Sequence, residues 1–170
     1  VVRGIRIAET RVRLSLGPPR HKRMAVKLED ITIREFSVQD LNKAQEYCDY
    51  INSLIGEDAK ILINRKQTLG EEKEFVKKTL EAIKVNKEVV VVAEHNGNII
   101  GITKIELSEY RRDHIGVLGI SVHRGYRGIG LGKTIMSKVI ELAKGKLTPK
   151  LKIIQLTVYE NNKPAQALYK

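Results

Sequence analysis

The sequence predicts one α/β (α+β) domain in which helices flank a central mixed, mostly antiparallel sheet. Its 170 residues, 42% of them hydrophobic, suit a single core and are too apolar for a disordered chain. Short apolar runs typical of strands alternate with longer segments in which apolar residues recur every three or four positions, as in amphipathic helices. Asn96-Gly97 separates two of the strand-like runs, and this pair favours a tight hairpin between antiparallel strands.

The first predicted strand covers Ile31 to Glu35, and Ser37-Val38-Gln39-Asp40 after it resembles a helix capping box with Ser37 as the cap. Upstream, Val12 to Leu16 alternates apolar and polar residues, a weak strand signal, and Gly17-Pro18-Pro19 separates it from the rest. Cys48 falls on the apolar stripe of the predicted helix, so we interpret it as a small buried hydrophobe. The stripe is formed by Leu41, Ala44, Tyr47, Cys48, Ile51 and Leu54.

A second capping box, Thr68-Leu69-Gly70-Glu71, opens the next predicted helix. The apolar positions of that helix are Phe75, Val76, Leu80 and Ile83. An apolar strand follows at 89–93, and the Asn96-Gly97 turn leads into a returning strand at 99–107. The sequence therefore predicts a helix followed by a hairpin.

The second half begins with a predicted strand from Ile115 to Val122, which contains Gly116 and Gly119. Glycine inside a strand indicates a bulge or a close backbone approach. A glycine-rich turn then opens a helix that is predicted to run to about Lys144 and to stop at Gly145. A further strand is predicted from Leu151 to Val158, and Pro164 suits the first turn of a last helix.

The net charge of +11 is unevenly spread along the chain. Residues 1–23 carry seven Arg and Lys residues and one Glu, a balance of +6. We interpret this segment as a basic N-terminal extension or leader upstream of Met24, with the domain itself at 24–170, in preference to a nucleic-acid-binding arm. The single cysteine, Cys48, fits a reducing compartment, so we expect a cytoplasmic protein, and no apolar run is long enough to cross a membrane.

The glycine-rich turn at 123–134 predicts a phosphate site. Glycines allow several backbone N–H groups to surround an anion, and the helix that begins there adds the positive end of its dipole. A nucleotide P-loop is excluded because its first glycine would fall at position 127, which is Arg127. A dinucleotide-binding turn would need glycine at position 133, which is Lys133, and a purely parallel layout disagrees with the hairpins.

A third pattern matches both the glycine-rich turn and a segment near the end of the sequence. Arg127-x-x-Gly130-x-Gly132 is similar to the R/Q-x-x-G-x-G/A signature of the GNAT acetyltransferase superfamily. The segment from Leu156 to Tyr169 resembles that family's L-x-V-x-x-x-N-x-x-A-x-x-L-Y pattern. Leu118 to Val122 resembles the strand before its loop. The resemblance covers roughly residues 31 to 170 and implies a GNAT-like sheet.

The resemblance implies direct transfer of an acetyl group from acetyl-CoA to an amine, with no metal. Tyr169 matches the family's general acid, and a backbone N–H near Gly119-Ile120, at an expected bulge, would polarise the thioester. Asn162 matches an asparagine that contacts the cofactor, and it can also cap the last helix. The residues implied to bind acetyl-CoA are Ile120, Ser121, Val122, Arg127, Gly128, Ile129, Gly130, Leu131, Gly132, Lys133 and Asn162.

No motif in the sequence identifies the general base. His114 begins the strand before the loop, and histidine is the residue type whose charge changes near neutral pH, so we assign it this role, with Glu35, Glu106 and Glu109 as alternatives. The remaining histidines do not have metal-ligand spacings, in line with the absence of a metal. The acceptor stays open between a small-molecule amine and a peptide N-terminus or lysine, as does a homodimer.

The sequence ends at Lys170, whereas the family continues after the tyrosine with two more strands. We therefore expect the C-terminal strands to be missing, with Val12 to Leu16 as a replacement strand. A non-catalytic acyl-CoA sensor of the same fold is the alternative function. A nucleic-acid binder that uses residues 1–23 is a third reading.

Overall fold

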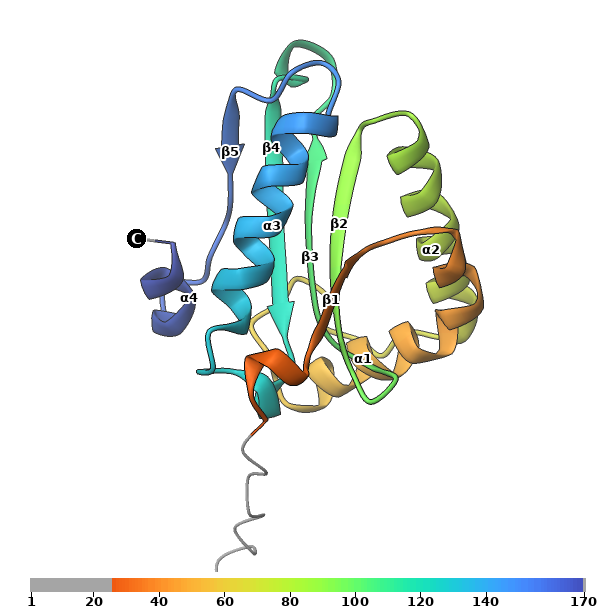
Figure 1. The fold of residues 1–170 in the computed structure, drawn as a ribbon, viewed down its shortest axis with the longest axis vertical. Coiled ribbons are helices and arrows are strands. Elements are labelled where there is room, and N and C mark those ends of the chain that lie inside the picture. Colours follow the sequence, from red (N-terminus) through yellow and green to blue (C-terminus); the bar gives the residue numbers. More distant parts are fainter. Residues whose placement is uncertain (1–25, 170) are drawn as a thin grey trace, which may run out of the picture.

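The computed structural model describes residues 26–169 and contains a five-stranded sheet with helices on both faces (Figure 1). The strands are β1 (Thr32–Glu35), β2 (Glu88–His95), β3 (Asn98–Leu107), β4 (Ile115–Val122) and β5 (Ile153–Gln155). The α-helices are α1 (Ala44–Gly56), α2 (Leu69–Lys84), α3 (Leu131–Lys146) and α4 (Lys163–Leu168). Short 3-10 turns occur at η1 (Leu28–Asp30), η2 (Val38–Lys43), η3 (Tyr110–Arg112) and η4 (Arg124–Tyr126).

The strands are ordered β1-β2-β3-β4-β5, which is also their order along the chain. Every neighbouring pair is antiparallel except β4 and β5, which are parallel. The predicted mixed, mostly antiparallel sheet is thus confirmed. The hairpin turn is confirmed as well, since Asn96 and Gly97 have φ values of 50° and 79°, the positive values that such a turn requires.

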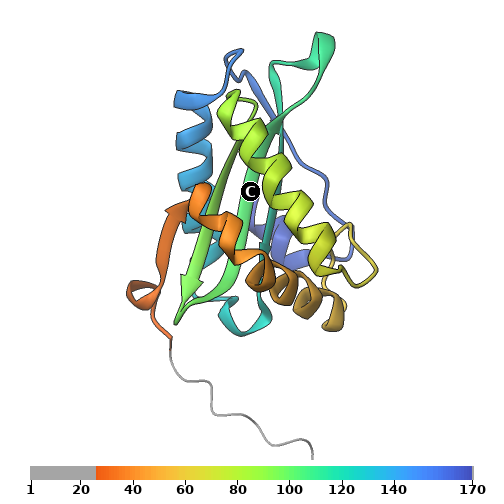
Figure 2. The same ribbon diagram turned by 90° about the vertical axis from the view of Figure 1, so that its right-hand side faces the viewer.

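The sheet separates two hydrophobic cores, as the alternation of side chains along β2 shows. Val89, Val91 and Ala93 point to one face, where α3 covers them, and Val90 and Val92 point to the other, under α1 and α2. Figures 1 and 2 show this three-layer arrangement from two sides, with α3 on one face and α1 and α2 on the other. Because both faces are buried, β2 is an almost continuous apolar run instead of an alternating one.

The capping box predicted at Ser37 is confirmed, and it belongs to a larger polar network. The Ser37 N–H donates to the Asp40 carboxylate at 2.8 Å, and Arg34 binds both oxygens of that carboxylate at 2.7 and 2.9 Å. The Tyr47 hydroxyl adds a 2.8 Å hydrogen bond to the fully buried Asp40 side chain. The prediction for Leu41 is wrong, since it is 47% exposed: the segment is a 3-10 turn, whose three-residue period is out of phase with the stripe of α1.

The second capping box and the buried cysteine are confirmed. The Thr68 N–H donates to the Glu71 carboxylate at 2.9 Å, and the Glu71 N–H donates back to the Thr68 hydroxyl at 3.3 Å. These bonds satisfy two N–H groups at the start of α2. Cys48 is buried on α1 beside the α1–α2 connection.

Two predicted boundaries in the C-terminal half are wrong. Helix α3 continues through Gly145 to Lys146 because Ala143 and Leu147, on either side, are buried in the core, and this packing outweighs the low helix propensity of one glycine. Strand β5 covers Ile153–Gln155 instead of Leu151 to Val158. It pairs with only three residues of β4, and beyond them it has no strand partner within residues 26–169.

The predictions for residues 1–23, including a replacement strand at Val12 to Leu16, lie outside the described residues. None of the helices in the described part combines the length and the apolar character needed to cross a bilayer.

Candidate functional site

The candidate site begins where β4 and β5 part. The parallel ladder joins Ile115 to Ile153 and ends at the pair Val117 and Gln155, whereas β4 continues to Val122. The expected bulge at Gly119 is not present, because β3 and β4 stay in register from Gly101–Val122 to Leu107–Gly116. The opening therefore comes from β5 leaving the sheet, not from an irregularity in β4. Figure 1 shows the chain after β5 turning away from β4 towards α4.

The direction of the β4 amides follows from its hydrogen bonds to β3. His123 N–H donates to Ile100 C=O at 2.8 Å, and Ile115 C=O accepts from Ser108 N–H at 2.8 Å, so odd-numbered residues of β4 face β3. Backbone groups alternate between the two sides of an antiparallel strand. The Ile120 N–H therefore points to the opposite side, towards the opening left by β5.

The glycine turn brings a helix N-terminus to the same end of β4. Gly128 and Gly130 have φ values of 80° and 87°, which a side chain would strain. Helix α3 starts at Leu131, and its Thr134 N–H donates to the Gly130 carbonyl at 3.1 Å. The N–H groups before Thr134 have no partner inside the helix, and together with the dipole they form the kind of site that binds phosphate.

The two basic residues of the turn differ in their surroundings. Arg127 Nε donates to the Val122 carbonyl at 2.7 Å, and its Nη2 forms an ion pair with Glu57 at the end of α1. Arg124 Nε lies 3.5 Å from the other oxygen of the same carboxylate. Glu57 was not predicted from the sequence, because it lies 70 residues before Arg127 and belongs to no motif.

The C-terminal motif joins the site through α4. A Cβ atom on Gly132 would lie 3.5 Å from Leu168 Cδ2, so α4 packs on the first turn of α3. Tyr169 follows Leu168, and burial raises the pKa of its phenol. Asn162 is confirmed as the cap of α4, since its side-chain oxygen accepts from Ala165 N–H at 3.3 Å. A surface pocket beside it is lined by Tyr159, Glu160, Asn161 and Lys163.

Ser121 connects the site to the other face of the sheet. Its Oγ lies 2.9 Å from the hydroxyl of Tyr50, a buried residue of α1. On the same face of β3, Lys104 Nζ contacts the carboxylates of Glu88 and Glu106, each at 2.8 Å. Burial raises the pKa of Glu88, which Lys104 partly offsets.

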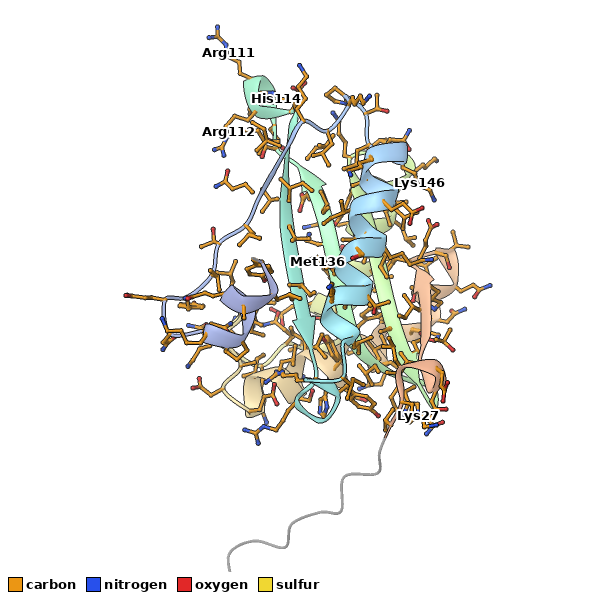
Figure 3. The ribbon with its side chains drawn as sticks, turned by 60° about the vertical axis from the view of Figure 1, so that its left-hand side comes forward. Lys27, Arg111, Arg112, His114, Met136 and Lys146 are labelled. Carbon is orange, nitrogen blue, oxygen red and sulfur yellow. The ribbon has the colours of Figure 1, made fainter. Side chains whose placement is uncertain are left out.

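The structure does not bring His114 to the glycine turn. In Figure 3, His114 lies at the same end of the molecule as Lys146, the last residue of α3, whereas the turn precedes the first residue of that helix. His114 and Ile120 are six residues apart along β4, about 20 Å at the rise of an extended strand. Of the alternative bases, Glu35 pairs with Lys146 and Glu106 pairs with Lys104.

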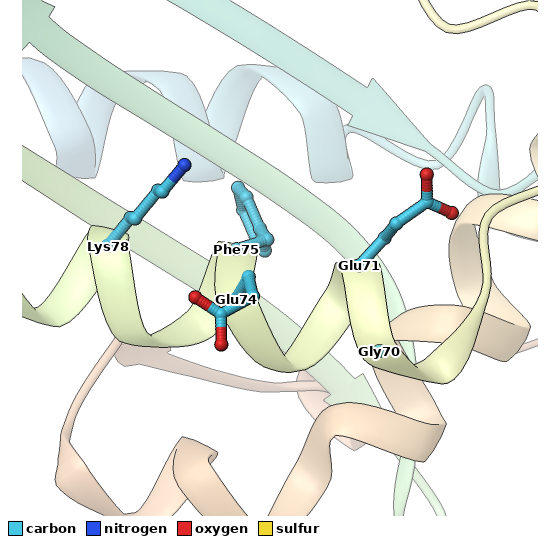
Figure 4. Close-up of a pocket in the computed structure, with 5 residues that line it drawn as sticks. All are labelled: Gly70, Glu71, Glu74, Phe75 and Lys78. Atoms are coloured by element: carbon cyan, nitrogen blue, oxygen red, sulfur yellow. The ribbon is translucent and has the colours of Figure 1, made fainter.

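A second surface pocket lies on α2, lined by Gly70, Glu71, Glu74, Phe75 and Lys78 (Figure 4). These residues all come from α2 and include none of the predicted site residues. Within residues 26–169 no group of three or more His, Cys, Asp or Glu side chains is arranged to hold a metal ion.

Comparison with known proteins gives a consistent result. A GNAT-family acetyltransferase from Streptococcus pneumoniae is similar in structure, with 29% identity, a TM-score of 0.69, and coverage of 82% of this chain and 80% of that one. The ribosomal-protein-S5-alanine acetyltransferase of Vibrio fischeri has 18% identity, a TM-score of 0.70 and coverage of 84% and 78%. The putative acetyltransferase YncA of Salmonella typhimurium, solved with acetyl-CoA, has 20% identity, a TM-score of 0.64 and coverage of 81% and 75%.

No curated protein matches the sequence. The acetyltransferase (GNAT) family matches residues 57–170, two thirds of the chain, and this range contains the glycine turn, β4 and the C-terminal motif. The two similarities below 25% identity concern the fold, and the fold is the one that the family match implies. The chain therefore belongs to the GNAT acetyltransferase family.

Proposed function

We propose that this protein transfers an acetyl group from acetyl-CoA to a primary amine by direct attack. The observation that carries this proposal is the arrangement at one end of β4. The Ile120 N–H points into the opening beside β5, and the unpaired N–H groups of the α3 N-terminus follow at the end of the same strand. The Ile120 N–H suits a thioester carbonyl, and the N–H groups at the start of α3 suit a pyrophosphate.

In this proposal the residues from Arg127 to Lys133 hold the pyrophosphate, mainly through backbone N–H groups. Ile120, Ser121 and Val122 line the part of β4 along which the acyl-bearing arm of the cofactor would lie. Asn162 uses its Oδ1 to cap α4, which leaves its Nδ2 as a donor towards the cofactor.

The chemistry requires two proton movements. The amine nitrogen attacks the thioester carbon, and the resulting oxyanion accepts a hydrogen bond from the Ile120 N–H. When the carbon–sulfur bond breaks, the thiolate of coenzyme A takes a proton from Tyr169, and the attacking amine gives its proton to a base. A phenol with its ordinary pKa of about 10 already carries a proton at neutral pH, and burial raises the pKa of Tyr169 further, so its proton is present when the thiolate departs.

The identity of the base stays a prediction. His114 is the residue predicted from the sequence, and a base that acts directly must lie within hydrogen-bond reach of the amine. The acceptor class, whether a small-molecule amine or a peptide N-terminus or lysine, is likewise a prediction, as are a cytoplasmic location and a homodimer.

A thiol-release assay tests the proposed function. Purified protein is incubated with acetyl-CoA and a panel of amines that includes amino acids, polyamines, aminoglycosides and peptides with free N-termini. We expect release of free coenzyme A that depends on one class of acceptor, with the acetylated amine detected by mass spectrometry. Binding of acetyl-CoA without turnover on any amine would instead identify a sensor, and absence of binding would refute both functions.

A further inference from the structure

The carboxylate of Glu57 holds two arginines of the glycine turn. Its Oε1 pairs with Arg127 Nη2, and its Oε2 lies 3.5 Å from Arg124 Nε. The Glu57 side chain is only 9% exposed, whereas the two arginines are 47% and 72% exposed. A carboxylate shielded from water interacts with its partners more strongly than an exposed one, so this contact differs from an ordinary surface ion pair.

The contact fixes the orientation of the Arg127 guanidinium. Its Nε is already bound to the Val122 carbonyl at 2.7 Å, and Glu57 binds Nη2 on the same planar group. Two anchored positions on a rigid fork determine the direction of the remaining donors. Within residues 26–169 Nη1 has no acceptor, so the anchored guanidinium of this residue, which precedes α3 in the glycine turn, keeps an unused donor group.

Glu57 is itself held in place by α1. Its backbone N–H donates to the Ser53 carbonyl at 3.1 Å, which continues the helical bonding of α1 by one residue. About two turns earlier, the hydroxyl of Tyr50 contacts Ser121 Oγ on β4 at 2.9 Å. Helix α1 is thus attached to β4 just before the turn, and the Glu57 carboxylate has a defined position relative to Arg127.

We propose that Glu57 is a positioning residue that holds Arg127 ready to bind the pyrophosphate of acyl-CoA, an inference that rests on the proposed function. Arginine otherwise loses side-chain freedom when it binds an anion, and a residue that orders it in advance removes that cost from binding. The alternative relationship is competition, in which Glu57 and the pyrophosphate bind the Arg127 guanidinium in turn, and the pyrophosphate has to displace the Glu57 carboxylate. The free Nη1 and the separate Val122 anchor favour positioning, since the pyrophosphate can bind without breaking either contact.

The two relationships predict opposite changes in affinity for acetyl-CoA. If Glu57 positions Arg127, Glu57→Ala raises the Kd for acetyl-CoA by about tenfold. The Arg127 side chain then regains its freedom of rotation, and binding of the pyrophosphate has to remove it. Glu57→Gln, which keeps an oxygen acceptor for Nη2, raises it by less than about threefold. If Glu57 competes with the pyrophosphate, both variants lower the Kd, because they release Arg127.

The experiment is calorimetric titration of acetyl-CoA into the wild type, both Glu57 variants, Arg127→Ala and the double variant Glu57→Ala/Arg127→Ala. Asp49→Ala is the matched control, because Asp49 is an exposed carboxylate on α1, the helix that Glu57 caps. We expect the control to bind like the wild type and the effect of Glu57→Ala to disappear when Arg127 is absent. A merely structural role of Glu57 would leave its effect unchanged in the double variant and so overturn the proposal.

A Kd that is unchanged or lower in Glu57→Ala would also overturn it. If Glu57→Ala does not fold, the sign of the change in Glu57→Gln still decides between positioning and competition. Failure of the wild type to bind acetyl-CoA is a different result, and it would refute the proposed function itself.

Discussion

Leu168 lies against Gly132, with its Cδ2 atom 3.5 Å from the point where a Cβ atom of residue 132 would be. This contact joins α4, which carries the C-terminal motif, to the first turn of α3, which belongs to the glycine turn. The two motifs that resemble the family are thus parts of one surface. The distance is an ordinary van der Waals separation, so a methyl group fits at position 132 and a larger side chain does not.

The two glycines of the signature should respond differently to alanine. Gly132→Ala adds a methyl group in ordinary contact at a helical position, and we expect a free energy of unfolding that is unchanged or higher by up to about 1 kcal/mol and a Kd for acetyl-CoA within about threefold of the wild type. Gly130 has a φ of 87°, so Gly130→Ala should lower the free energy of unfolding by about 1–2 kcal/mol and weaken acetyl-CoA binding. Thermal melting and calorimetry measure both. Equal behaviour of the two variants would contradict the role assigned to the positive φ.

Tyr169→Phe should lower kcat while leaving the affinity for acetyl-CoA nearly unchanged. The variant removes the proton donor but keeps the ring that is half-buried at the end of α4. We expect a loss in kcat of at least about 100-fold, typical of a missing general acid. Steady-state kinetics and titration with acetyl-CoA separate the two effects, and Tyr159→Phe, at an exposed tyrosine on the same segment, is the control. Unchanged turnover would remove Tyr169 from the mechanism.

Asp40 should make the stability of the fold depend on pH. Burial alone would raise the pKa of the Asp40 carboxyl, but hydrogen bonds from Arg34, Ser37 and Tyr47 lower it below its usual value. The stability that it contributes is therefore fully present above the unfolded-state pKa of about 3.9 and is lost as the pH falls through the lower, folded-state pKa. Asp40→Asn should lower the free energy of unfolding at pH 7 by about 3 kcal/mol, because it breaks a buried pair.

Urea denaturation of the wild type and Asp40→Asn between pH 7 and pH 3 measures this effect. We expect the difference between the two proteins to shrink at the acidic end. Asp58→Asn is the control, since that carboxylate is 91% exposed in its ion pair with Lys60 and should contribute about 0.5 kcal/mol or less. A difference between wild type and Asp40→Asn that does not vary with pH would contradict the assignment.

His114→Gln tests the base predicted from the sequence. His114 lies about 20 Å along β4 from Ile120, beyond the reach of a base that acts directly, so we expect kcat/KM to change by less than about threefold. The pH profile of kcat/KM in the variant should then keep the inflections of the wild type. A loss of about 100-fold together with the disappearance of an inflection near neutral pH would establish His114 as the base.

Local signals in the sequence predicted the elements well wherever neighbouring residues decide the structure. The capping boxes at Ser37 and Thr68, the Asn96-Gly97 turn and the start of the last helix at Pro164 all depend on residues within four positions of one another. Predictions failed where contacts between segments far apart in the sequence decide where an element ends. Gly145 does not end α3, because Ala143 and Leu147 on either side of it are buried in the core, and the β5 strand is short because the chain leaves β4 after three paired residues.

The sequence alone determined the family, the sheet class and the position of the glycine turn. These features depend on residue types at short, fixed spacings, which act on the local backbone and can be recognised without the tertiary structure. Only the tertiary structure decided how the opening at β4 forms, that Leu168 meets Gly132, and that Glu57 holds Arg127. Each of these depends on segments far apart in the chain. Their meeting is set by the packing of helices on both faces of the sheet, which no short spacing in the sequence encodes.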